Sequence, residues 1–165
     1  MAELIVEELG GLGIATVMAR KGVTGAAIGA ILGVEPPTGP GAAYADDLTI
    51  IGTGPESWLV VKANAAPDFA NQLSTALAGL ASVSDQSSSY AVTRLAGPQA
   101  RTVLQRGAAI DFHPDSFRHG SAVTTVIAHI GVIIWQTDQP AYHVATFRSY
   151  AHSFRHWLDT TIATV

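Results

Sequence analysis

Apolar and polar residues alternate over several short stretches of the chain, and this alternation predicts β-strands. The helical spacing of apolar residues between some of these stretches predicts helices from Val23 to Leu32, from Pro67, from Pro98 and from Ser149. The expected strands are Ile14–Arg20, Leu48–Gly52, Trp58–Lys62, Tyr90–Leu95, Ala122–Ala128, Val132–Gln136 and Tyr142–Phe147. Two of the turns between them, Thr53–Glu56 and His129–Gly131, predict hairpins.

Residues at the ends of the helices suggest where each one starts and stops. Pro98 suits the first turn of a helix, and Gly107 is expected to end that helix in the left-handed conformation. Ser149 is expected to cap the last helix. One face of that helix would carry Tyr150, Phe154, Trp157, Leu158 and Ile162.

Three segments lack the regular spacing of apolar residues that predicts a helix or a strand. Residues 35–44 hold three prolines and two glycines and are expected to form a loop, and residues 82–88 are polar and typical of turns. Residues 1–13 mix Leu4, Ile5 and Val6 with glutamates and end in glycines, so they form either a short helix or an arm. An apolar arm of this kind often docks elsewhere, and we expect a partner to receive it; the alternative is a frayed terminus.

The two halves of the chain resemble one another. Residues 48–73 align with residues 133–158 at one constant offset, which places Phe69 over Phe154 and Leu73 over Leu158. We therefore expect an α+β fold of two split βαβ, ferredoxin-like units, each an antiparallel sheet with helices on one face. The expected division is an N-terminal arm, 1–13, and one domain, 14–165, made of subdomains 14–82 and 83–165.

The composition narrows the classes of function. Charged residues make up only 13% of the sequence, against about 25% in an average protein. A low charged share favours a chain whose surface is partly covered by partners.

The net charge of −4 with nine Lys and Arg argues against a nucleic-acid binder. The absence of cysteine excludes disulfides, thiol catalysis and Cys-ligated metal. No leader pattern is evident and the apolar runs are too short to span a bilayer, so we expect a cytoplasmic protein without a membrane partner.

Candidate catalytic groups are few and scattered. Asp46 and Asp47 precede a strand and could serve as a base or a cation anchor, or could simply be solvated. His152 and His156 have metal-competent spacing but no adjoining glutamate. The serines of residues 84–89 lack a nucleophile elbow and are expected to bond nearby backbone. The sequence therefore predicts no catalytic, cofactor-binding or metal residue in this chain.

The strand-to-helix junction at residues 147–150 is the candidate for partner contact. Phe147, Arg148 and Tyr150 combine the residue types that are enriched in protein interfaces. An inter-subunit contact of Arg148 is favoured over two alternatives, an internal bond at the helix end and a bound anion.

Several segments in fixed order carry a family resemblance. These are Ser84–Ser87, the Gly97-Pro98 segment 94–100, Ile110–Pro114 and the tail around Phe147–Tyr150 and Phe154–Leu158. Together they resemble the gamma subunit of heterotetrameric sarcosine oxidase and, more distantly, the glycine-cleavage T-protein (aminomethyltransferase) superfamily. The resemblance implies a T-protein folate-binding-like fold in a structural subunit of an oxidoreductase, whose complex demethylates sarcosine to glycine with tetrahydrofolate as one-carbon acceptor.

The resemblance also implies where the cofactors and partners are. FAD, FMN, NAD, tetrahydrofolate and zinc would be held by the alpha, beta and delta subunits, with alpha in direct contact with this chain. One alternative is a stand-alone folate-dependent aminomethyltransferase-like protein, but the segment after Gly97-Pro98 where that family carries its aspartate, residues 129–133, has no acid. Another alternative is a ferredoxin-like sensor of a small metabolite.

Overall fold

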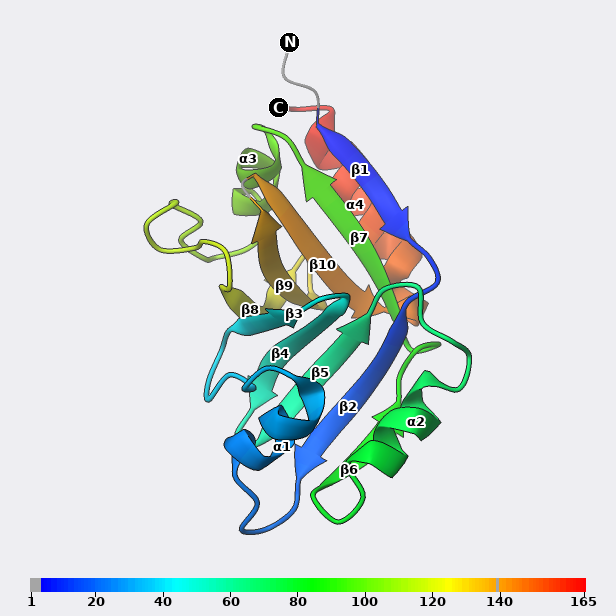
Figure 1. Cartoon of the computed structure of the whole chain (residues 1–165). Coiled ribbons are helices and arrows are strands. Elements are labelled where there is room, and N and C mark those ends of the chain that lie inside the picture. The colour runs from blue at the N-terminus through cyan, green and yellow to red at the C-terminus, as the bar shows by residue number, and fades with distance from the viewer. Residues whose placement is uncertain (1–3, 139) are drawn as a thin grey trace. The chain divides into compact units, whose positions relative to one another are not determined.

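The computed structural model describes residues 4–138 and 140–165 and divides into two compact units. The 10–88 unit is Gly10–Ser88, and the 89–165 unit is Ser89–Val165 together with the described residues up to Leu9. Each unit is a five-stranded sheet with two α-helices (Figure 1). The strand pairs of the described ranges are all antiparallel, so the predicted α+β class with two antiparallel sheets is confirmed.

The sheet of the 10–88 unit has the strand order β3-β4-β5-β2-β6. Its strands are β2 (Gly13–Ala19), β3 (Ala42–Ala45), β4 (Leu48–Gly54), β5 (Ser57–Lys62) and β6 (Ala81–Asp85), and its helices are α1 (Gly25–Leu32) and α2 (Phe69–Ala76). Both helices contribute to one core with alternate residues of the strands, such as Val17, Ile50 and Val60. Alternation along a strand sends every second side chain to the same face, so both helices cover one face of this sheet.

The sheet of the 89–165 unit has the order β1-β7-β10-β9-β8. Its elements are β1 (Ile5–Leu9), β7 (Tyr90–Ala96), α3 (Ala100–Gln105), β8 (Ala122–Ile127), β9 (Ile130–Asp138), β10 (Ala141–Phe147), the 3-10 turn η1 (Arg148–Tyr150) and α4 (Ala151–Ile162). Leu104 of α3 and Phe154 and Leu158 of α4 pack with Leu95 and Val144 of the sheet. None of the helices in the described ranges is long and apolar enough to cross a bilayer.

The two sheets share one strand order once equivalent strands are matched. β4 and β5 correspond to β9 and β10, because the pair Ile50–Val60 recurs as the pair Ile134–Val144 at a single offset in the sequence. The fifth strand of each sheet comes from the other repeat: β6 pairs with β2, and β1 pairs with β7. Each repeat therefore begins with a strand that completes the sheet of the other repeat.

This exchange corrects the interpretation of residues 1–13. They contain neither a helix nor a free arm in the described part, because Ile5–Leu9 is an edge strand paired with β7 from Ile5↔Ala96 to Leu9↔Val92. A similar correction applies to the polar segment after Leu80, where Ala81–Asp85 forms edge strand β6. Edge strands tolerate charged and polar residues, which weakens the hydrophobic alternation that would reveal them in a sequence.

The constant offset between the halves is correct for the last helices but not for the strands. Phe69 and Phe154 are both buried, yet they lie one position further apart in the sequence than Ile50 and Ile134 do. Since side chains alternate between faces, a slip of one residue would exchange the buried and outer faces of a strand. The link between strand and helix is therefore one residue longer in the second repeat.

Two helix-end predictions are wrong. Gly107 is not in the left-handed region, whereas Gly97, before α3, has φ of 108°. A side chain at Gly107 would overlap the Trp157 ring and lie 2.7 Å from Ile127, so close packing explains this glycine. Ser149 does not cap α4 either, because residues 148–150 form a 3-10 helix and Tyr150 occupies the N-cap position of α4. Tyr150 is half exposed and therefore does not lie on the buried face of the helix.

Candidate functional site

The β10–α4 junction is ordered by bonds to the start of β7. The Arg148 backbone N–H donates to the Ser89 carbonyl at 2.7 Å, and its guanidinium Nη2 donates to the Tyr90 carbonyl at 2.7 Å. The Tyr90 ring stacks on Phe147 with centroids 4.9 Å apart, and partial burial raises the pKa of the Tyr90 hydroxyl. Arg148 therefore makes an internal bond, although to a strand carbonyl and not to the helix end.

Aromatic rings at the same junction are open to solvent. Phe147 is 50% exposed and Tyr150 is 51% exposed. Exposed aromatic residues beside an arginine are typical of interface anchors, because they bury a large area at little cost in side-chain entropy. We define this surface, Phe147, Arg148 and Tyr150, as the junction surface.

Asp46 and Asp47 lie on the β3–β4 turn, and both are exposed. Asp46 has φ of 50°, a conformation that aspartate adopts more readily than most residues. An ion pair of 3.9 Å joins Asp47 to Lys62, and Lys62 lies over the Phe69 ring. The turn borders an open groove of about 360 Å³ whose walls are Ile31, Leu32, Leu48, Phe69, Leu73 and Ala76. Lys62 and Gln72 also line this groove, so the two carboxylates border a site of mixed polarity in which Asp47 pairs with Lys62.

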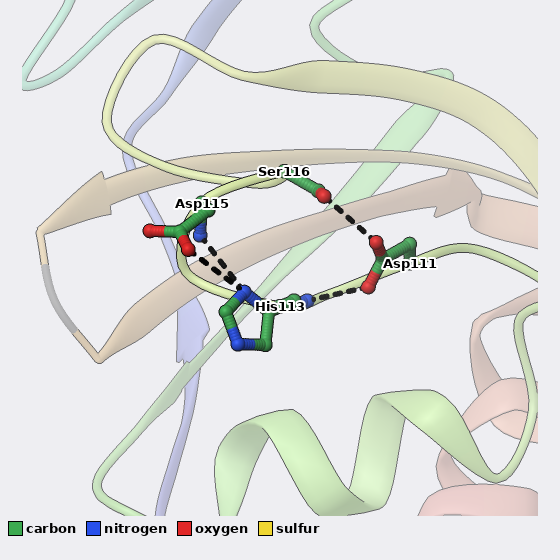
Figure 2. Close-up of polar contacts among 4 residues, drawn as sticks. All are labelled: Asp111, His113, Asp115 and Ser116. Atoms are coloured by element: carbon green, nitrogen blue, oxygen red, sulfur yellow. Dashed lines mark hydrogen bonds and ion pairs between the residues drawn. The ribbon is translucent and has the colours of Figure 1, made fainter.

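The segment between α3 and β8 holds a small polar network, shown in Figure 2. Asp111 accepts hydrogen bonds from the Ser116 hydroxyl at 2.7 Å and from the His113 backbone N–H at 2.9 Å. These bonds, the Ser116 bond first, lower the pKa of the Asp111 carboxyl. The His113 Nδ1 lies 3.5 Å from an Asp115 carboxylate oxygen.

The same segment is anchored by two aromatic residues. Phe112 and Phe117 are buried, and the Phe112 ring meets Tyr142 edge-on at 5.8 Å. The polar network therefore shapes a turn between two core anchors, and its exposed side chains form no enclosed site.

Among the serines of residues 84–89, Ser87 bonds backbone at a strand junction, as predicted. The Ile14 N–H donates to the Ser87 hydroxyl at 2.9 Å, and the Ser87 N–H donates to an Asp85 carboxylate oxygen at 2.9 Å. The bonds from the Ser87 backbone and side chain lower the pKa of Asp85. The cluster therefore fixes the strand junction between β6 and β2.

The histidine pair of α4 is exposed. His152 and His156 face solvent, and neighbouring Arg155 forms an i,i+4 ion pair with Asp159 at 2.8 Å. Within residues 4–138 and 140–165, no three His, Cys, Asp or Glu side chains are grouped to hold a metal ion.

Sequence reasoning missed a small cavity in the 89–165 unit. It is lined by Glu8, Thr93, Thr146, Arg148 and the first turn of α4, among others. The available signal was threonine at strand positions whose neighbours on the same face are apolar. Threonine is common in strands, so that signal alone does not distinguish a cavity from an ordinary strand.

Known proteins are similar to this chain in sequence and in fold. Residues 38–138 match the GCVT N-terminal domain family. The sarcosine oxidase gamma subunit of Arthrobacter sp is 32% identical over 136 residues, which cover 81% of this chain and 66% of the relative. That of Corynebacterium sp. (strain U-96) is 32% identical over 144 residues, covering 85% and 70%. That of Corynebacterium sp. (strain P-1) is 28% identical over 130 residues, covering 76% and 62%. The chain thus spans about two thirds of the length of these relatives.

Solved structures agree with these matches. A chain of the heterotetrameric sarcosine oxidase from Corynebacterium sp. U-96, in complex with pyrrole 2-carboxylate, superimposes with a TM-score of 0.87 at 28% identity. The match covers 98% of this chain and 84% of that chain. The glycine cleavage system aminomethyltransferase T from Bartonella henselae has the same fold, with a TM-score of 0.69 at 15% identity over 95% of this chain and 45% of its own. From its sequence and its fold, this chain belongs to the family of sarcosine oxidase gamma subunits, among proteins with a GCVT N-terminal domain.

Proposed function

We propose that this chain is an assembly subunit of a complex that oxidatively demethylates sarcosine to glycine, with tetrahydrofolate as the one-carbon acceptor. The observation that carries the proposal is the agreement of two likenesses. Relatives named as gamma subunits match more than three quarters of the chain, and a chain of a heterotetrameric sarcosine oxidase shares its fold over 98% of the residues.

The expected partners are the alpha, beta and delta subunits, which would hold FAD, FMN, NAD, tetrahydrofolate and zinc. We expect the complex to be cytoplasmic. The contribution of this chain would be binding surface. Its low charged fraction and the two half-exposed rings of the junction surface support that role. We expect the contact with alpha to include Phe147, Arg148 and Tyr150 and to bury at least about 1,000 Å² in total.

The β8–β9 turn argues against the transferase alternative. It follows the Gly-Pro helix, where the T-protein resemblance would place a catalytic aspartate, and instead carries Ala128 and His129, both with positive φ. Asp46 and Asp47 occupy a similar turn, between β3 and β4, in the other repeat. A chain with its carboxylates in the other repeat lacks the arrangement on which the transferase proposal depends.

Co-expression with the three partner subunits tests the proposal. We expect one complex by mass measurement, with sarcosine-dependent formation of hydrogen peroxide. The double variant Asp46→Asn, Asp47→Asn should retain activity within a few-fold, because loss of a general base would cost about 10²–10⁴-fold. A complex of the other three subunits that forms and turns over fully without this chain would refute the assembly role.

Variants of the junction surface test the predicted contact. Tyr150→Ser should weaken assembly at least about tenfold, as expected for an interface anchor, and leave the thermal unfolding of the free chain nearly unchanged. Met18→Ser is a matched control, because Met18 is 54% exposed in the 10–88 unit. Equal effects of the two variants on assembly would show that the junction surface has no special role.

A further inference from the structure

The inward face of the second sheet changes from apolar to polar along the strands. One row across β1, β7 and β10 is Val6, Leu95 and Tyr142. The next row on the same face is Glu8, Thr93 and Val144, and the row after it contains Ala91 and Thr146. The end of the sheet beneath the start of α4 therefore presents hydroxyls and a carboxylate next to the apolar row of Val6, Leu95 and Tyr142.

A cavity of about 110 Å³ lies at this polar end. Its lining residues are Glu8, Leu9, Ala91, Val92, Thr93, Thr146, Arg148, Ala151 and Phe154. Thr146 and Phe154 are each 2% exposed, whereas Glu8 and Arg148 are exposed, so the cavity has a buried floor and a charged rim. At roughly 30 Å³ for each water, the volume suits a few waters or one small organic ion.

The two threonine hydroxyls of the cavity are available to a ligand. Thr146 is 2% exposed and Thr93 is 8% exposed, so more than nine-tenths of each residue is buried. Neither hydroxyl has a hydrogen-bond partner among the described residues. Both threonines line the cavity, so a molecule inside it can supply the missing hydrogen-bond partner.

Positive and negative groups both line the rim. The Arg148 guanidinium is held beside the cavity by its bond to the Tyr90 carbonyl. The positive charge of the guanidinium attracts a carboxylate at this rim. Helix α4 (Ala151–Ile162) lines the cavity with Ala151 of its first turn, so the positive end of its dipole adds to this field. Glu8 of β1 supplies the opposite charge.

We infer that this cavity binds a small zwitterion, a free α-amino acid of about the size of glycine. Its carboxylate would lie beside the positive charge of Arg148 and take hydrogen bonds from the threonine hydroxyls near the helix end, and its ammonium group would pair with Glu8. A simple anion would be repelled by Glu8, and a simple cation would be repelled by Arg148 and the helix dipole. All the lining residues belong to this chain, and because Arg148 is also part of the junction surface, the free chain is the form in which the site is tested.

Calorimetric titration of the full chain tests the inference, with glycine, acetate and methylamine as probes. Glycine should bind with one site per chain and at least about tenfold more tightly than either single-charge probe. Thr146→Val keeps the shape of the side chain and should weaken glycine binding at least about tenfold, the effect of losing a hydrogen bond to a charged group. Thr124→Val on β8 is the matched control and should bind like the parent, because Thr124 is exposed and outside the cavity.

A variant at the rim separates the two charges of the ligand. Glu8 is exposed, so Glu8→Gln should fold normally, lose affinity for glycine and retain or gain affinity for acetate. Acetate binding as tight as glycine binding in the parent chain would refute the zwitterion. No binding of any probe at millimolar concentration, or glycine binding that Thr146→Val leaves unchanged, would mean that the cavity holds water only and would overturn the inference.

Discussion

The two repeats fill the same corner of their sheets in different ways. In the 10–88 unit, the Phe69 ring packs against Gly13, where an added Cβ would lie 2.6 Å from the Cβ of Ala65 and against the ring. In the 89–165 unit, the equivalent strand position is Ala91, because Gly13 pairs with Lys62 as Ala91 pairs with Thr146. There the corner is a cavity bounded by Phe154 and two hydroxyls.

This difference shows how one scaffold can lose or keep a polar cavity through small changes. The repeat with glycine lets an aromatic ring approach the sheet, and its lysine extends from the same row to the exposed carboxylate of Asp47. The repeat with alanine and threonine leaves space and hydroxyls at the same place. The two repeats therefore have the same strand order but different chemistry at this corner.

Truncation of the two equivalent phenylalanines should have the largest effect on stability. Phe69→Ala and Phe154→Ala should each lower the free energy of unfolding by about 3–5 kcal/mol, because each ring is buried between helix and sheet. Urea unfolding measures both. A loss below about 1 kcal/mol for either variant would show that the two rings do not play equivalent roles.

The glycines after the first helices of the two repeats should differ in a measurable way. Gly33 ends α1 with φ of 85°, and its N–H donates to the Gly29 carbonyl at 2.8 Å. Gly33→Ala should therefore cost about 1 kcal/mol through backbone strain. Gly107→Ala should cost about 1–3 kcal/mol, because its Cβ would overlap Trp157.

Replacement of Trp157 separates the two causes. Trp157→Ala is destabilising by itself, since the ring packs against the core and stacks on Phe154 at 5.8 Å. In that background Gly107→Ala should cost less than in the parent chain, because only the close contact with Ile127 remains, whereas Gly33→Ala should cost as much as before. If the cost of Gly107→Ala were undiminished without the Trp157 ring, overlap with that ring would not be its cause.

The smallest expected effects concern two aspartates in similar turns, one in each unit. Asp85 and Asp111 each accept a hydrogen bond from the backbone N–H two residues later, and both have lowered pKa values. Ser87→Ala should raise the pKa of Asp85, and Ser116→Ala should raise that of Asp111, in carboxyl titrations followed by NMR. A carboxyl with a lowered pKa stabilises the fold at pH values above its unfolded pKa of about 3.9, and this contribution disappears as the pH falls through the folded pKa. An unchanged titration in both serine variants would contradict this account.

Much of the fold could be predicted from local pattern. The strands around Val17, Val60, Leu95 and Val144 have a clear alternation, and the expected hairpins and helices lie within a few residues of those in the structure. The repeat was also detectable, because Phe69 and Phe154 occupy equivalent places in their helices. The register of the repeat was not, since a shift of one residue changes the face of a strand while hardly changing a sequence alignment.

The site was less predictable than the fold. Phe147, Arg148 and Tyr150 could be selected by residue type, and two of them are half exposed, but the bond from Arg148 to Tyr90 joins residues 58 positions apart. The cavity was missed because its threonines look like ordinary strand residues. Their role depends on how the Phe154 ring packs, because this ring and the two threonines line the same cavity. Such packing is a property of the three-dimensional structure.

The sequence by itself determined the local elements of this protein, because alternation, helical spacing and turn residues act between neighbours along the chain. Only the tertiary structure decided which sheet received each edge strand, why Gly107 has no side chain and where the buried hydroxyls of Thr93 and Thr146 met a cavity. These outcomes depend on contacts between distant residues, and their distances and steric overlaps are set once the sheets and helices have packed.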